Sequence, residues 1–149
     1  MLRGRLALAS VYLFFVCLLG LMHQSAARAC SPDTLTKVRN LITETPAMKE
    51  KLNCSLYTPT AQDYKQTCPK STLKCFTNET KVLIEEWVAI NFGPISTLRK
   101  VHRNLQILSA KFNQPESECR QCEFLNEKNA EEFLEQLAVT LQTMNSEYC

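Results

Sequence analysis

The pattern of apolar and polar residues from Cys119 to the C-terminus ends in a long stretch with helical spacing. Its apolar residues recur three or four positions apart, as on one buried face of an α-helix. Acidic residues are concentrated early in the stretch, where the positive end of a helix dipole favours anions. The apolar residues are Phe133, Leu134, Leu137, Ala138, Leu141 and Met144, and the acidic ones are Glu127, Glu131, Glu132 and Glu135. The pattern predicts a last helix that needs other helices to cover its apolar face.

A first helix is predicted near the other end of the chain. Ser31-Pro32-Asp33 supplies a capping residue and a proline in the first turn. Pro46 then interrupts the pattern, because an interior proline removes a hydrogen bond and clashes with the preceding turn. Either the helix kinks there or Thr45 caps a second short segment to about Leu52, and we expect a kinked or broken first helix. Its apolar positions are Leu35, Val38, Leu41 and Ile42.

Two more helical patterns lie in the middle of the chain, on either side of Phe92-Gly93-Pro94. We predict helices from about Asn78 to Asn91 and from about Pro94 to Phe112. Glycine after one helix and proline at the start of the next predict a very short loop, which makes the two helices antiparallel neighbours. The apolar stripes are Val82, Leu83, Trp87 and Ile90 in one helix, and Leu98, Val101, Leu105, Leu108 and Phe112 in the other.

The remaining connections are polar. Residues 53–72 contain prolines and no hydrophobic rhythm, so we interpret them as a long crossover. Residues 113–118 are polar, contain Pro115 and begin a second connection, which leads to the Cys-x-x-Cys pair and the last helix. No segment gives a convincing strand pattern. Long, short and long connections between four helices are what an up-up-down-down bundle requires, since its two parallel pairs need long crossovers. The predicted fold class is therefore an all-α, up-up-down-down four-helix bundle with two long crossovers.

The first 29 residues have the composition of a secretory signal peptide. A basic start is followed by an apolar run from Leu6 to Met22 and a small-x-small site, Ala27-Arg-Ala29. The alternative is a membrane anchor, because the apolar run is close to the shortest length that spans a bilayer. The small-residue site favours the signal peptide. We therefore expect residues 1–29 to be removed and residues 30–149 to form one secreted, extracellular domain.

Removing residues 1–29 changes the charge balance. Residues 30–149 contain 14 basic and 15 acidic residues, a formal net charge of −1, which does not support a bulk nucleic-acid binder. Four basic side chains fall off the apolar stripe of the predicted third helix. They form either a solvated face or a surface for an acidic partner. These residues are Arg99, Lys100, Arg103 and Lys111.

Seven cysteines remain in residues 30–149, and in a small secreted domain they are expected to form disulfides. Zinc held by four thiolates is the competing interpretation for Cys68, Cys75, Cys119 and Cys122, but the oxidising route disfavours it. No cofactor is expected. Asn53 and Asn78 each begin an N-glycosylation sequon.

Several motifs resemble, in order and spacing, the interleukin-15 and interleukin-15-like branch of the interleukin-2 family of cytokines. The resemblance is strong over residues 56–76 and 116–145, moderate in the predicted third helix and weak in the first. It implies a short-chain four-helix cytokine with two disulfides, Cys68–Cys119 and Cys75–Cys122. The motifs are Leu56-Tyr-Thr58, Cys68-x6-Cys75-Phe76, Glu118-Cys-Arg-Gln-Cys122-Glu, Glu127-Lys-Asn129 and Glu132-Phe-Leu134.

The resemblance leaves three cysteines unassigned. In this topology the start of the first helix and the end of the last lie at the same end of the bundle. We therefore predict a Cys30–Cys149 disulfide, which leaves Cys54 without a partner in the same chain. Cys54 could instead pair with Cys30 or Cys149, or join two molecules.

The resemblance also implies a function: a cytokine that brings receptor chains together and triggers JAK-STAT signalling in lymphocytes. Its implied partners are an alpha-receptor, a shared beta chain and a common gamma chain. The Asn78 sequon falls within the implied alpha surface, and Lys100 and Arg103 replace acidic residues of the family's beta surface. Residues at matching positions are Tyr57, Glu79, Val82 and Glu86 for alpha, Asn104 for beta and Gln142 for gamma.

Two other function classes fit the sequence less well. Catalysis is not expected, because His102 is the single histidine of residues 30–149 and no nucleophile has a partner at a suitable spacing. A saposin-like module that binds lipids or membranes would also be small, helical and rich in disulfides. Its disulfides staple helix ends, whereas four cysteines here fall in predicted crossovers. We do not expect direct membrane insertion.

Overall fold

The computed structural model describes residues 29–45, 53–65, 68–113 and 119–149. Residues 1–28 of the predicted signal peptide and the predicted short segment from Pro46 to Leu52 lie outside the described residues.

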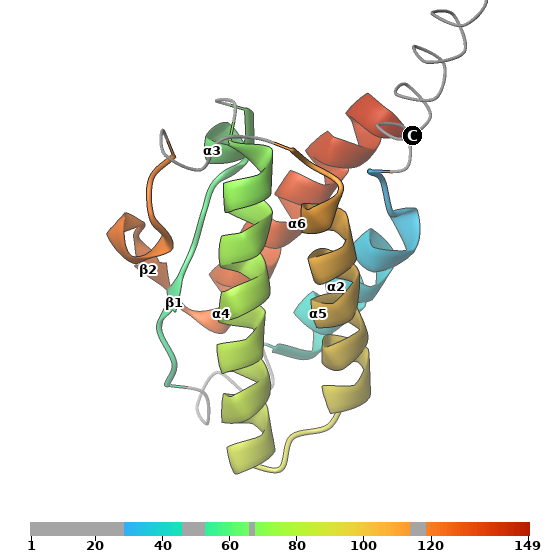
Figure 1. Ribbon diagram of the computed structural model, residues 1–149. Coiled ribbons are helices and arrows are strands. Elements are labelled where there is room, and N and C mark those ends of the chain that lie inside the picture. The colour runs from blue at the N-terminus through green and yellow to red at the C-terminus, as the bar shows by residue number, and fades with distance from the viewer. Residues whose placement is uncertain (1–28, 46–52, 66–67, 114–118) are drawn as a thin grey trace, which may run out of the picture.

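Within the described residues, four long helices form an up-up-down-down bundle (Figure 1), so the predicted fold class is confirmed. Helix α5 packs against both α4 and α2, and α2 packs mainly against α6. A short helix, α3 (Ala61–Lys65), and a 3-10 turn, η3 (Cys122–Phe124), lie in the two crossovers. The long helices are α2 (Pro32–Glu44), α4 (Pro69–Ala89), α5 (Ile95–Ala110) and α6 (Ala130–Tyr148).

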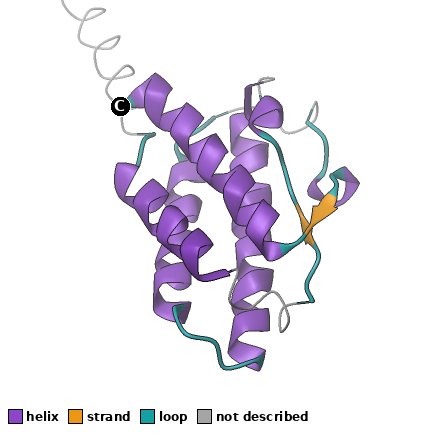
Figure 2. Ribbon diagram, turned by 180° about the vertical axis from the view of Figure 1, so that it is seen from behind, coloured by secondary structure: helices purple, strands orange, loops and turns teal. Residues whose placement is uncertain are grey.

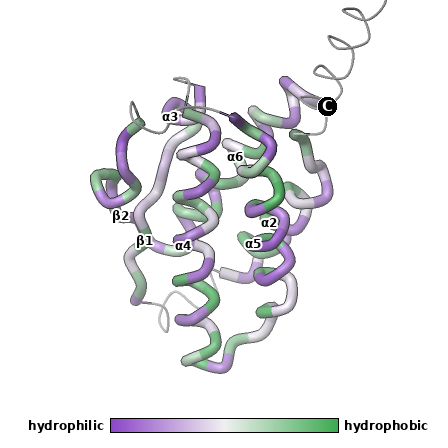
Figure 3. The backbone as a smooth tube through the Cα atoms, in the orientation of Figure 1, coloured by the Kyte–Doolittle hydropathy of each residue, from purple (hydrophilic) through white to green (hydrophobic). Residues whose placement is uncertain are grey.

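The apolar stripes of the helices meet in one core, and hydrophobic and hydrophilic residues interchange along each helix (Figure 3). The stripe predicted for α6 is buried except for Ala138, which is partly buried. The rings of Phe76 on α4 and Phe133 on α6 lie 5.5 Å apart at their centroids. Trp87 is fully buried, with its ring edge-on to Phe92 at 4.9 Å.

Helix α4 begins at Pro69, nine residues before the predicted start at Asn78. Pro69 was interpreted as a loop residue, but proline suits the first turn of a helix, where its missing N–H is not needed. The predicted stripe was also wrong at two positions: Val82 is 37% exposed, and Ile90 caps the helix end. The buried stripe instead follows a strict spacing of three and four: Leu73, Phe76, Thr80, Leu83 and Trp87.

The expectation of no strand was wrong, because a short antiparallel ladder joins the two crossovers. Strand β1 (Leu56–Tyr57) pairs with β2 (Glu127–Lys128), and the two lie side by side in Figure 2. Leu56 is opposite Lys128 in this pairing. Two residues per strand are too few to give an alternating pattern. Glu127 therefore lies in a strand, and α6 starts after Asn129, whose side chain accepts a hydrogen bond from the N–H of Glu132 at 2.9 Å.

Three disulfides join cysteines of the described residues: Cys30–Cys149, which the bundle topology predicted, and Cys68–Cys119 and Cys75–Cys122, which the family resemblance implied. The first joins the start of α2 to the end of α6, where the N–H of Ser31 also donates to Asn145 Oδ1 at 2.8 Å. The other two tie α4 and the residue before it to the second crossover. They use all four cysteines of the zinc interpretation. Cys54 has no disulfide partner in the part of the chain that the structure describes, and it packs, partly buried, against the core.

Candidate binding surfaces

The residues predicted for the alpha surface lie on β1 and one face of α4. The backbone N–H of Tyr57 donates to Glu79 Oε2 at 2.8 Å, so Glu79 fixes the first crossover onto the helix. Val82 and Glu86 follow one and two turns later on the same face, and the Glu86 side chain is exposed. The structure thus gathers these four residues on one surface, with Glu79 partly committed to an internal contact.

Two further carboxylates come to this surface from the second crossover. Burial raises the pKa of Glu79, the hydrogen bond from Tyr57 opposes this, and nearby Glu123 and Glu127 raise the pKa further. The sequence interpretation had not placed Glu123 or Glu127 here. The available signal was Cys122, since its disulfide to Cys75 brings η3 one turn from Glu79. We call Glu79, Glu86, Glu123 and Glu127 the acidic face.

Both asparagines of the sequons are exposed. Asn78 lies beside a shallow hollow of about 390 Å³ between α4 and the second crossover, which is also lined by Cys122 and Glu123. A glycan at Asn78 would therefore stand at the edge of the acidic face. Occupancy of Asn53 and Asn78 stays a prediction.

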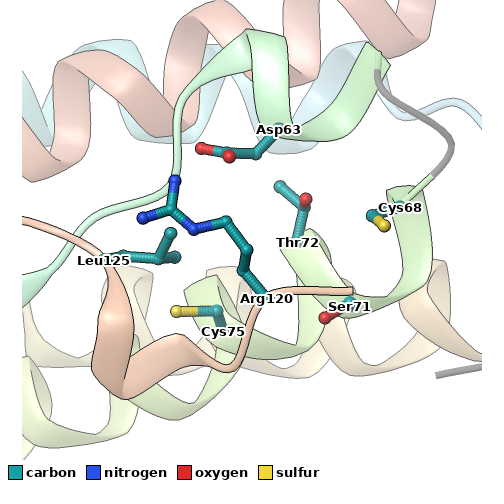
Figure 4. A pocket seen from close by; sticks show the side chains of 7 residues that line it. All are labelled: Asp63, Cys68, Ser71, Thr72, Cys75, Arg120 and Leu125. Atoms are coloured by element: carbon teal, nitrogen blue, oxygen red, sulfur yellow. The ribbon is translucent and has the colours of Figure 1, made fainter. Parts of the chain in front are cut away.

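A small cavity of about 110 Å³ lies between the two disulfides of the crossovers. Asp63 of α3 and Arg120 of the second crossover point toward one another across it (Figure 4). Asp63 accepts hydrogen bonds from the N–H and hydroxyl of Thr60, and Arg120 donates to the carbonyl of Phe124 at 3.3 Å. Ligand pockets usually measure roughly 300–1,000 Å³. The cavity is therefore best explained as a small space between the packed crossovers and not as a ligand site.

The residue predicted for the beta surface connects two helices. Asn104 on α5 donates through Nδ2 to Thr34 Oγ1 on α2 at 3.0 Å, so part of its amide serves the bundle itself. Beside it, Lys100 and Arg103 are exposed, and Ile107 is 52% exposed. Sequence reasoning had not singled out Ile107.

The residue predicted for the gamma surface lies where α2 and α6 meet. Gln142 is exposed on α6, and Arg39 on α2 donates to its Oε1 at 3.4 Å. The structure therefore places the three predicted surfaces on three different groups of elements: α4 with β1, α2 with α5, and α2 with α6.

Comparison with known proteins matches residues 12–145 to the model of the interleukin 15 family. Interleukin-15 of Homo sapiens and of Chlorocebus aethiops are each 31% identical over 109 residues, or 72% of this chain and 62% of theirs. Interleukin-15 of Mus musculus is 32% identical over 89 residues, 56% of this chain and 50% of the relative. The aligned part thus spans about three fifths of the length of the first two relatives.

Among the described helices, none has both the length and the apolar character needed to cross a bilayer. The match to the family model covers most of the chain, and the bundle and disulfides agree with it. The interleukin-15 family is a family of cytokines and not of enzymes. This chain is a member of the interleukin-15 family.

Proposed function

We propose that this chain is a secreted cytokine that binds an alpha-receptor, a shared beta chain and a common gamma chain, and so triggers JAK-STAT signalling in lymphocytes. Residues 1–29 act as the signal peptide and residues 30–149 as the cytokine domain. No bond is made or broken in this mechanism. The receptor chains signal because the bundle holds them close together.

One observation carries the proposal: three residue groups at family-matching positions lie on different groups of elements in a bundle linked by disulfides. Tyr57 contacts Glu79, Asn104 contacts Thr34 and Gln142 contacts Arg39, each across a different pair of elements. A passive organiser of several partners needs surfaces that can be occupied at the same time. Helices tied by three disulfides can hold such surfaces in fixed relative positions.

The alpha-receptor is assigned to the acidic face together with Tyr57 and Val82. Carboxylates from α4, η3 and β2 around a partly exposed valine suit a partner with basic pockets, because complementary charges steer encounter and fix register. Since Glu79 also anchors Tyr57, Glu86 is the better residue with which to test recognition alone.

The test is co-expression of the full chain with candidate alpha-receptor ectodomains, followed by pull-down. STAT phosphorylation is then measured in lymphocytes bearing beta and gamma chains. We expect Glu86→Lys to weaken alpha capture about tenfold, as expected for loss of a charge-complementary contact. Glu135→Lys on the exposed side of α6 is the matched control. Equal capture by both variants would mean that the alpha site lies elsewhere on the chain. Capture of no receptor chain by the wild-type protein would reject the proposed function.

A further inference from the structure

Helix α5 stands out because its charges have one sign. From Ile95 to Ala110 it contains no aspartate or glutamate, although residues 30–149 as a whole are nearly neutral. Its exposed arginines and lysine are therefore a local feature. Within the described residues, neither Lys100 nor Arg103 forms an ion pair or another recorded electrostatic contact. Both charges are available to a partner.

These charges share a face with an exposed apolar residue. Lys100, Arg103, Asn104 and Ile107 follow the i, i+3, i+4, i+7 spacing of one helix face, opposite the buried stripe of α5. Ile107 is 52% exposed, and a hollow of about 100 Å³ beside it is lined by Ser31, Asn104 and Leu108 among others. We call Lys100, Arg103 and Ile107 the basic face.

The hydrogen bond from Asn104 to Thr34 sets the geometry of this face. It joins α5 to the buried Thr34 in the first turn of α2, so this hydrogen bond links the two helices before a partner arrives. A preformed surface with an apolar centre and charged neighbours resembles the core and rim of a protein interface. A flexible polyanion would contact the two cations but would gain nothing from an apolar side chain such as Ile107. The apolar centre therefore favours a protein partner.

We propose that the basic face is a docking surface for an acidic protein ectodomain, one that places carboxylates against Lys100 and Arg103 and an apolar socket over Ile107. This inference rests on the proposed function and specifies its beta-type contact. The receptor chain that binds across α2 and α5 is selected by its acidity. An ectodomain with a basic surface at the same place is rejected, because like charges brought together at an interface cost several kcal/mol.

The test measures capture of candidate beta-chain ectodomains by the full chain, with alpha capture recorded in parallel. Lys100→Glu and Arg103→Glu should each weaken beta capture about tenfold and reduce its dependence on salt. Ile107→Ser should weaken it by a similar factor, as expected for loss of a central apolar contact. The matched controls lie on α4: Lys81→Glu for charge, and Val88→Ser, at 50% exposed, for apolar surface. Both controls should leave beta capture unchanged.

Three results would overturn the inference in different ways. If the charge reversals weaken beta capture while Ile107→Ser behaves like Val88→Ser, the contact is purely electrostatic and the apolar socket over Ile107 is rejected. If beta capture survives all three changes, the beta contact lies elsewhere, although alpha capture would still support the proposed function. If the wild-type chain captures no receptor chain, both the proposed function and this inference are rejected.

Discussion

The acidic and basic faces differ in how they are built. The acidic face is assembled from α4, η3 and β2, which are held together by the Cys75–Cys122 disulfide, the β1–β2 ladder and the hydrogen bond from Tyr57 to Glu79. The side chains of the basic face all lie on the single helix α5, and one hydrogen bond, from Asn104 to Thr34, links that face to α2. A composite face depends on long-range links, so it should be lost when those links are cut. A face on one helix should survive.

Cutting disulfides is the strongest way to test this difference. Replacing Cys75 and Cys122 by alanine should cost about 4 kcal/mol of unfolding free energy, and replacing Cys30 and Cys149 about 5 kcal/mol, in the chain-entropy model. The bridged residues are 47 and 119 positions apart. Although the second variant is the less stable, we expect only the first to lose alpha capture while still folded.

Urea unfolding and receptor capture, measured on the same preparations, check this prediction. The capture assays must be run below the onset of unfolding of each variant, so that loss of binding reports on the face and not on the fold. Loss of alpha capture in both variants to the same degree would mean that the acidic face does not depend on its local disulfide.

The anchor of the acidic face gives the next largest effect. Glu79→Ala removes the acceptor of the Tyr57 N–H and should cost about 1–2 kcal/mol, as expected when a partly buried donor loses its partner. Glu86→Ala, on the same face but exposed, should change stability by less than about 0.5 kcal/mol. Hydrogen exchange at Tyr57 should become faster only in the first variant. If the Tyr57 amide keeps its protection in Glu79→Ala, the anchor is not the carboxylate.

The same contrast explains what the sequence could predict. The cations of the basic face and the buried stripes of α5 and α6 follow from helical spacing within one segment, so Lys100, Leu105 and Phe133 were placed correctly. Ile107 was not singled out, because one exposed isoleucine does not break the helical pattern. The acidic face was predicted only in part. Glu123 and Glu127 lie more than 35 positions after Glu79, and a spacing rule within one helix cannot bring them together. Only the disulfide pairing, taken from a family resemblance, pointed to that proximity.

The errors in the predicted fold have identifiable causes in the sequence. Pro69 can end a loop or begin a helix, and only the buried positions before Asn78, Leu73 and Phe76, decide between the two. The misplaced helix start also put Val82 in the core. The β1–β2 ladder was not predicted, because a strand of two residues is too short to show alternating apolar and polar positions. Its pairing also depends on contacts between crossovers that are far apart in the sequence.

The crowding of carboxylates on the acidic face predicts a pH effect. Because the pKa of Glu79 is raised in the fold, mainly by burial, the folded chain holds this proton more tightly than the unfolded chain does. The associated stability is present below the ordinary glutamate value of 4.5 and is lost as the pH rises through the raised pKa. The wild-type unfolding free energy should therefore fall relative to Glu79→Gln as the pH rises above 4.5.

Denaturant titrations of both proteins across this pH range provide the measurement. Glutamine keeps an acceptor for the Tyr57 N–H, so the comparison isolates the charge. Adding Glu123→Gln and Glu127→Gln to the wild type should shrink the pH-dependent difference, because those carboxylates help to raise the pKa. A difference that grows in favour of the wild type with rising pH would contradict the assignment.

The smallest effect tests whether the basic face ends at the seam between α4 and α5. Burial lowers the pKa of His102, and Lys81 across the seam lowers it further. Lys81→Ala should therefore raise the pKa of His102, read from the imidazole proton shifts in an NMR titration, while burial keeps it below the ordinary 6.5. Lys100→Ala should leave it unchanged, because Lys100 lies on the opposite side of α5 from His102. If Lys100→Ala raises the pKa of His102 as much as Lys81→Ala does, the positive charge of α5 acts around the whole helix. The basic face then has no boundary where α5 meets α4.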